Sequence, residues 1–193
     1  MKVLKINSSA RYERSFSREL VEEMVTKYKT DNFEVIDRDL AKGVSLLSEK
    51  HIQAFYTPAE QRTPEQESLL EESNQLVDEV VSADVIIVGV PIYNFGVPAN
   101  LKAWADLVSR VGMTFSYTDQ GPVGLISDKP VYLIMTSGGT QVNSDIDFAS
   151  TWLTHFFSFI GINNVKIIDS GQIMVKGEDI VSQAKEYIEQ IQI

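Results

Sequence analysis

The 193-residue sequence predicts an α/β protein in which helices cover both faces of a parallel β-sheet. Five short apolar segments alternate with longer stretches whose apolar residues recur every three or four positions, as in successive β–α–β units. Two of the apolar segments, residues 84–90 and 130–136, show little alternation and are typical of strands buried on both faces. Right-handed crossovers between the strands then give a three-layer α/β/α sandwich.

Each of the five expected strands is a short apolar or β-branched run. We find no internal repeat, low-complexity tract or linker between them, so residues 1–193 are expected to form one domain. The strands are expected at residues 2–7, 33–37, 84–90, 130–136 and 165–170.

The expected helices each carry one apolar face. The helix after Thr63 has the clearest start, because Thr63 can cap it, Pro64 suits its first turn and Gln66 can complete a capping box. Residues 39–62 are long for one connection and are expected to contain a short additional helix. The other helices are expected at residues 17–28, 98–111, 147–160 and 177–191.

The composition is that of an ordinary globular protein, with 44% hydrophobic and 23% charged residues. The net charge of −10 argues against general binding of nucleic acid or of anionic membranes. The absence of cysteine excludes disulfides, thiolate metal sites and thiol nucleophiles. No apolar run approaches the roughly 20 residues of a membrane-spanning helix, and the first residues are too polar for a signal peptide, so we expect a cytoplasmic protein.

Ligands of open parallel sheets bind beyond the carboxyl ends of the strands, which directs attention to three loops. The first loop, residues 8–17, contains four serines and opens a helix, so its hydroxyls and backbone N–H groups suit a phosphate. The alternative is a polar loop in which a serine caps the helix, and these residues alone leave both interpretations open. Neither a GxGxxG fingerprint nor a Walker loop occurs here.

The second loop, residues 91–98, combines two aromatic residues, an asparagine and two prolines. A flat heteroaromatic ring needs such a rigid backbone, with apolar area for its face and amides for its polar edge. A stiff aromatic turn packed on neighbouring helices would have the same composition. The third loop, which begins at Thr136, places Gly138 beside Gly139, and this pair suits either a close backbone approach to a ligand or an ordinary turn.

Side chains for acid–base, nucleophilic or metal chemistry are sparse. The two histidines, His51 and His155, belong to no metal motif, so no metal site is predicted. Ser15 and Ser17 have no histidine at a recognisable motif spacing, which disfavours a serine hydrolase. A protein with this inventory can take its chemistry from a bound cofactor, and a flavin fits the three loops.

The three loops resemble those of the FMN-dependent NADH azoreductases, which also act as NADH:quinone reductases. The resemblance rests on Ser9 with residues 15–17, on residues 91–95 and on residues 136–139. Shorter matching stretches, such as Thr-Phe-Ser-Tyr-Thr at residues 114–118, extend it over nearly the whole chain. It implies a flavodoxin-like fold with a five-stranded parallel sheet in the order 2-1-3-4-5.

The resemblance also implies a role for each matching position. The first loop would hold the phosphate and ribityl end of FMN, the second would line the isoalloxazine ring, and the third would meet its pyrimidine edge. Some relatives carry Arg where this chain has Ser137. The implied cofactor-binding residues are Ser9, Ser15, Phe16, Ser17, Pro91, Ile92, Tyr93, Asn94, Phe95, Thr136, Ser137, Gly138 and Gly139.

Two aromatic residues, Tyr117 and Phe159, match positions that shape the substrate cavity in the family. The alternatives are interface packing for Tyr117 and core packing for Phe159. No catalytic side chain is implied, since the flavin carries the hydride.

By resemblance, the protein is a homodimeric enzyme that uses bound FMN and NADH to reduce quinones and to cleave aromatic azo compounds to amines. Family members follow a ping-pong scheme in which NADH and the acceptor use one cavity in turn. Two alternatives stay open: a flavodoxin-type electron carrier, which the acidity favours, and a hydrolase of the same fold without flavin. Steady NADH turnover with a quinone would separate the enzyme from the carrier, and a protein that stays colourless with FMN would indicate the hydrolase.

Overall fold

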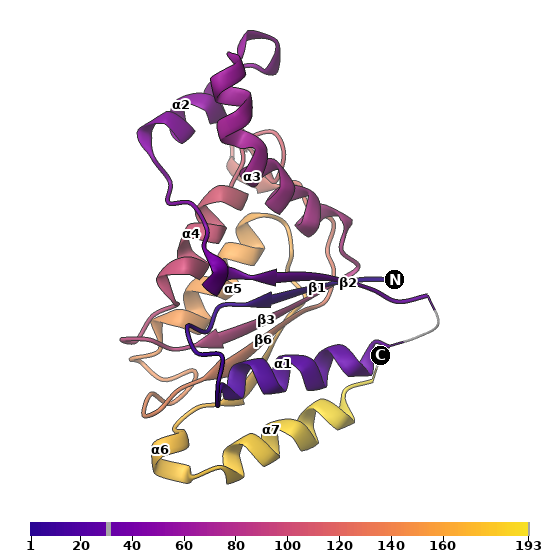
Figure 1. Cartoon of the computed structure of the whole chain (residues 1–193), viewed down its shortest axis with the longest axis vertical. Helices are drawn as coiled ribbons and strands as arrows, with labels where there is room; N and C mark the ends of the chain where they lie inside the picture. Colours follow the sequence, from indigo (N-terminus) through magenta and orange to yellow (C-terminus); the bar gives the residue numbers. More distant parts are fainter. Residues whose placement is uncertain (30–31, 193) are drawn as a thin grey trace.

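A computed structural model describes residues 1–29 and 32–192 (Figure 1). At its centre lies a parallel five-stranded sheet in the spatial order β2-β1-β3-β6-β7. Strands β4 and β5 form a separate two-stranded sheet. When only the five parallel strands are numbered along the chain, their spatial order is 2-1-3-4-5, so the predicted fold class is confirmed. The five strands are β1 (Lys2–Asn7), β2 (Glu34–Asp39), β3 (Val85–Pro91), β6 (Val131–Thr136) and β7 (Val165–Ser170).

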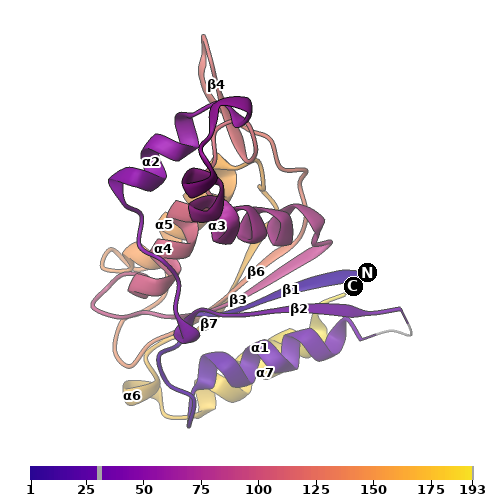
Figure 2. The same ribbon diagram turned by 45° about the horizontal axis from the view of Figure 1, so that its top comes forward.

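Helices cover the sheet in two layers (Figure 2). On one face, α1 (Phe16–Lys27) lies beside α7 (Asp179–Gln190). The opposite face carries α3 (Pro64–Ser82), α4 (Ala99–Val108) and α5 (Phe148–Phe159). Within the described residues, every helix falls short of the length and apolar character that a membrane crossing requires.

The connection between β2 and α3 contains the additional helix that its length predicts. This helix, α2, projects with the start of α3 from one end of the molecule (Figure 1). Short 3-10 turns precede and follow it. The three elements are η1 (Leu40–Lys42), α2 (Glu49–Tyr56) and η2 (Ala59–Gln61).

Strand β3 is buried along its whole length, as its continuous apolar run predicts. Ile86 and Val88 pack with Trp104 of α4 in the core beneath α3, α4 and α5. On the opposite face, Ile87 packs with Met24 of α1 in a second core. Full burial of one such aliphatic side chain contributes about 1.5–3 kcal/mol, so the two cores together fix the sheet and the points where its loops emerge.

Two observed elements are absent from the sequence-based expectations. A hairpin pairs β4 (Phe115–Thr118) with β5 (Gly121–Gly124), and α6 (Ile173–Lys176) forms a single turn after β7. Each is four residues long, which is too short to display a strand or helix period. The hairpin packs against the end of α5, where a Cβ on Gly124 would lie 2.0 Å from the backbone nitrogen of Gly161, so position 124 requires glycine.

Two predicted elements end at other residues than expected, because of contacts with neighbouring segments. Strand β2 ends two residues later than expected because its pairing with β1 continues to Asp39. Helix α4 ends at Val108, three residues earlier than expected. Beyond it, the backbone N–H of Arg110 donates to Thr114 Oγ1 at 2.9 Å and turns the chain toward β4.

Candidate functional site

The three loops singled out in the sequence meet at one edge of the sheet. They follow β1, β3 and β6, which are neighbours, so parallel pairing brings their carboxyl ends together. A cavity of about 320 Å³, the smaller cavity, lies between them. Its lining residues are Ser9, Arg11, Arg14, Ser15, Phe16, Ser17, Pro91, Ile92, Tyr93, Thr136, Ser137, Gly138, Ile173 and Met174.

A cluster of hydroxyl groups stands at the start of α1. Ser15 Oγ donates to Ser9 Oγ at 2.9 Å and lies 3.3 Å from Ser17 Oγ. Although Ser15 is the N-cap residue of α1, its side chain makes no capping hydrogen bond. The first backbone N–H groups of the helix are therefore left without a side-chain cap, and together with the hydroxyls they form a cradle for an anion.

The loop that carries this cradle is held by a single arginine. Arg18 donates two hydrogen bonds to the carboxylate of Asp39, at 3.0 and 2.8 Å, and this carboxylate stands at the end of β2. Arg18 also donates to the backbone carbonyls of Ser9 and Arg11, at 2.8 and 2.9 Å. Burial alone would raise the pKa of Asp39, but the hydrogen bonds from Arg18 and from the backbone N–H of Ala41 lower the pKa of this carboxyl below its usual value.

The second loop makes a tight turn with two left-handed residues. Tyr93 and Gly96 exchange backbone hydrogen bonds of 3.0 and 3.1 Å, while Asn94 and Phe95 have φ angles of 49° and 70°. Asparagine tolerates this conformation, but for phenylalanine it is strained. The Phe95 ring is half exposed.

The third loop is fastened to α6. Ser137 Oγ accepts from the backbone N–H of Gln172 at 2.9 Å and donates to the carbonyl of Thr140. The backbone N–H of Met174 donates to the carbonyl of Gly138 at 2.9 Å. Because the Ser137 hydroxyl is engaged in this way, it positions the loop rather than pointing free into the cavity.

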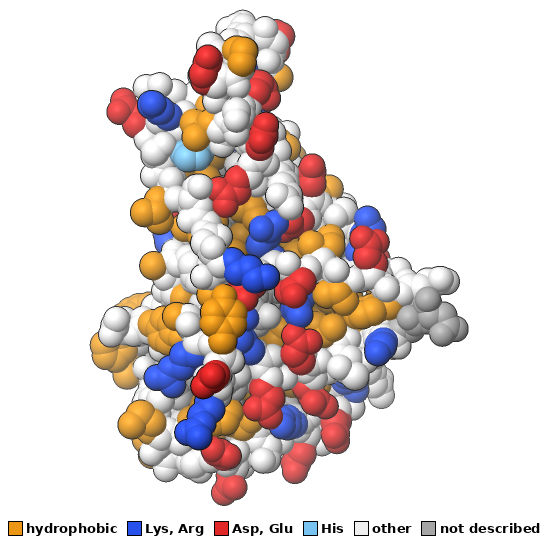
Figure 3. Space-filling view, viewed as in Figure 1, with side chains coloured by type: hydrophobic (Ala, Val, Ile, Leu, Met, Phe, Trp, Pro, Cys, Tyr) orange, Lys and Arg blue, Asp and Glu red, His pale blue; other side chains and the backbone are white. Residues whose placement is uncertain are grey.

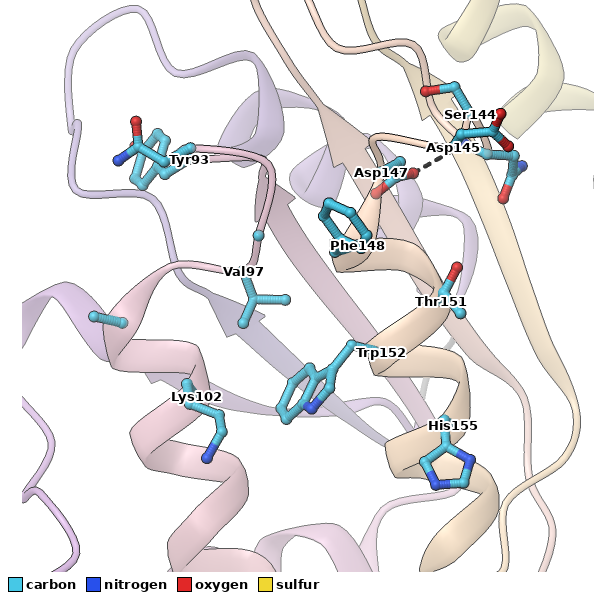
Figure 4. A pocket seen from close by; sticks show the side chains of 14 residues that line it. Tyr93, Val97, Lys102, Ser144, Asp145, Asp147, Phe148, Thr151, Trp152 and His155 are labelled. Atoms are coloured by element: carbon cyan, nitrogen blue, oxygen red, sulfur yellow. Dashed lines mark hydrogen bonds between the residues drawn. The ribbon is translucent and has the colours of Figure 1, made fainter.

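A larger cavity of about 1250 Å³ adjoins the smaller one, since Tyr93 lines both. It lies between the second loop, α4 and α5, and Figure 4 shows Lys102 of α4 and Trp152 of α5 close to each other in its lining. Lys102 Nζ lies 5.8 Å from the centre of the Trp152 ring, and Phe148 stands at the start of α5. The cavity thus offers aromatic faces to a flat molecule beside the flavin-sized site.

The structure distributes the predicted site residues among three places. Asn94 lines the larger cavity, whereas Phe95 and Gly139 are absent from the lining of either cavity. Tyr117 and Phe159 also lie outside both linings and instead flank Phe115, with ring centres 5.5 and 4.5 Å from it. Those in the smaller cavity are Ser9, Ser15, Phe16, Ser17, Pro91, Ile92, Tyr93, Thr136, Ser137 and Gly138.

Four residues that line the smaller cavity are not among the site residues predicted from the sequence. Ile173 and Met174 belong to α6, a single turn without a readable period, so no sequence signal locates them. Arg11 and Arg14 lie within the first loop, where a count of cations beside the serines would have found them.

The two histidines lie in different parts of the fold. Among residues 1–29 and 32–192, no group of three or more His, Asp or Glu side chains is placed to hold a metal ion. His51 instead completes a capping box at the start of α2, where its Nδ1 accepts from the backbone N–H of Ser48 at 3.3 Å. His155 lies on α5 and lines the larger cavity.

The smaller cavity fits a phosphorylated flavin. The hydroxyl cluster and the uncapped start of α1 suit its phosphate, and the rigid second loop suits one face of its ring. On the third loop, Gly138 lines the cavity and presents backbone rather than a side chain to it.

Comparison with known proteins places these features in a wider group. A family model described as a flavodoxin-like fold matches residues 1–192. A Hahella chejuensis protein named FMN-dependent NADH:quinone oxidoreductase 1 is 44% identical over 97% of this chain and 93% of its own. Its namesake from Colwellia psychrerythraea is 43% identical over 99% and 100%. A solved azoreductase from Bacillus anthracis superposes with a TM-score of 0.88 at 26% identity, over 97% of this chain and 96% of its own.

We expect Asp39→Asn to destabilise the protein most at neutral pH. Because folding lowers the pKa of Asp39, its stabilising contribution is present above the unfolded-state pKa of about 4 and is lost as the pH falls through the folded-state value. The difference in melting temperature from the unaltered protein, measured by circular dichroism, should shrink below about pH 4. Asp37→Asn is the control, since its exposed pair with Lys5 contributes little. A deficit that stays constant with pH would contradict this account.

Phe95→Gly should raise the free energy of unfolding by about 1 kcal/mol, because glycine adopts a positive φ without steric strain. Asn94→Gly serves as the matched control at the neighbouring left-handed position and should give a smaller gain, since asparagine already tolerates this conformation. Urea unfolding of the three proteins measures the difference. Equal gains at the two positions would show that Phe95 is not specially strained.

Proposed function

The chain belongs to the family with the flavodoxin-like fold, and we propose that it is an FMN-dependent NADH:quinone oxidoreductase. Relatives with that name are 43–44% identical to it over nearly the whole chain. The observation that carries the proposal is the convergence of three loops on one cavity whose lining suits a phosphate at one end and a flat ring at the other.

The chain's own residues would hold FMN from three sides. The hydroxyls of Ser9, Ser15 and Ser17, with the first N–H groups of α1, would bind its phosphate. The turn at Tyr93 and Asn94 would lie along the ring, and backbone N–H groups of residues 136–139 would stabilise negative charge at the pyrimidine edge. When bound, FMN supplies the two-electron hydride chemistry that these side chains lack.

The larger cavity would receive the hydride donor and the acceptor. Phe148 and Trp152 provide apolar faces that exclude water and stack on flat molecules. We propose that NADH and the acceptor occupy this space in turn, which is a ping-pong scheme. One NADH and one proton convert a quinone to a hydroquinone; cleavage of an azo bond to two amines takes four electrons and therefore two such cycles.

A flavodoxin-type electron carrier is the second candidate, and the net charge of −10 favours it because carriers dock through charge. The larger cavity favours the enzyme, since a carrier has no need of an acceptor pocket next to its flavin.

We expect the purified chain to turn yellow with FMN, to bleach on anaerobic addition of NADH and to regain its colour when a quinone is added. Steady-state assays should then show continuous NADH oxidation with the quinone. With an azo dye, two NADH should be consumed per dye bleached. A protein that binds FMN but supports no NADH turnover would be the carrier, and one that stays colourless would be neither.

We further propose that the enzyme is a homodimer whose interface includes the larger cavity, because apolar side chains stand exposed around it. Phe148 is 64% exposed there. Sedimentation should show a dimer, and Phe148→Glu should shift it toward the monomer. Tyr187→Glu is the control, because Tyr187 is 48% exposed on α7, on the opposite side of the sheet. A monomer with full NADH turnover would refute the interface.

A further inference from the structure

The smaller cavity has a charge opposite to that of the chain. The protein carries 27 acidic against 17 basic residues. Among the residues that line the cavity, the charged ones are Arg11 and Arg14, and the lining includes no carboxylate. Figure 3 shows basic side chains, with an acidic side chain among them, over the loop that leads into α1, whereas acidic side chains dominate along the helix itself.

These two arginines differ from the third arginine of the segment. Arg18 is committed to Asp39 by two hydrogen bonds and serves to fix the loop. Within the described part of the chain, neither Arg11 nor Arg14 takes part in an ion pair. Exposed cations beside a cavity, without a carboxylate partner, are available to an anionic ligand.

The hydroxyl cluster locates the anion on the same wall. Ser9 and Ser17 are both 2% exposed, and Ser15 joins them through contacts of 2.9 and 3.3 Å. The backbone N–H of Arg11 donates to Ser9 Oγ at 3.2 Å, which ties the first arginine to the cluster. Arg14 directly precedes Ser15 and has a φ of 52°, so the loop holds it in an uncommon conformation next to the hydroxyls.

We propose that Arg11 and Arg14 form a cationic rim that makes this site selective for the phosphorylated flavin, FMN, over riboflavin. The inference rests on the proposed function, because it assumes that the smaller cavity holds the flavin. The hydroxyls and helix N–H groups can also donate to an uncharged sugar hydroxyl, whereas two guanidinium groups add charge-assisted hydrogen bonds that only the charged phosphate can accept in full. The ring contacts are common to both flavins, so the ratio of their affinities isolates the contribution of the phosphate.

The test compares dissociation constants for FMN and riboflavin, measured by flavin fluorescence with the flavin-free full-length chain. Arg11→Gln/Arg14→Gln should weaken FMN binding by about tenfold or more while changing riboflavin binding less than about twofold. Arg14→Lys should retain most of the selectivity, because it keeps the charge. Lys50→Gln is the matched control for each single variant, Arg11→Gln or Arg14→Gln, since it also removes one positive charge, on exposed α2, and should leave both constants unaltered.

Salt gives an independent measurement. The affinity of the unaltered chain for FMN should fall as potassium chloride is raised, because the rim is exposed and its charge is screened. The double variant should show a shallower dependence, and riboflavin binding should be insensitive in both proteins. If the double variant does not fold, the FMN and riboflavin dissociation constants and their salt dependence are measured for the single variants Arg11→Gln and Arg14→Gln instead.

Four outcomes would overturn the inference. Equal weakening of FMN and riboflavin would show that the arginines only support the loop. An unchanged affinity ratio with a raised KM for NADH would assign them to the dinucleotide phosphates instead. Failure of the unaltered chain to bind FMN would overturn the proposed function as well, whereas FMN binding and NADH turnover with an unchanged ratio would remove the arginine rim alone.

Discussion

Parallel pairing of β1, β3 and β6 is the constraint on which the site depends. Asn7 is in register with Gly89, and Pro91 with Thr136, so three chain segments far apart in sequence end at the same edge of the sheet. Burial of β3 on both faces prevents that register from slipping, because a shift by one residue would exchange the side chains of the two cores. The loops can therefore vary in composition while their starting points stay fixed.

Each loop is then held by polar contacts of its own rather than by the cores. Arg18 and Asp39 tie the first loop to β2, and Ser137 ties the third to the backbone of Gln172. The second loop relies on reciprocal backbone hydrogen bonds across a strained turn at Phe95. Such contacts fix backbone N–H groups in place before a ligand arrives, which lowers the ordering cost of binding. The strained backbone of Phe95 is part of this arrangement of the second loop.

The sequence predicted the sheet, the long helices and the three loops, because each is marked by an apolar period or by its position after a buried strand. The hairpin and α6 are too short to show a period, and both are fixed by distant contacts, such as the close approach of Gly124 to Gly161. The place of the serines before a helix left a phosphate site and a helix cap both open, and the structure shows that Ser15 makes no side-chain cap. The availability of Arg11 and Arg14 could not be predicted, because it depends on which of three nearby arginines Asp39 engages.

The chain is acidic although FMN and NADH are anionic, and the distribution of its charges explains how it can still bind them. FMN and NADH carry phosphate groups, and a chain of net charge −10 repels them at long range. At physiological salt, however, charges separated by more than about 8 Å are largely screened, so the groups at the cavity rim decide the local field. There the unpaired charges are Arg11 and Arg14, supported by the positive end of the α1 dipole. Net charge alone would suggest a surface that docks cationic partners, whereas the residues that line the cavity favour an anionic ligand.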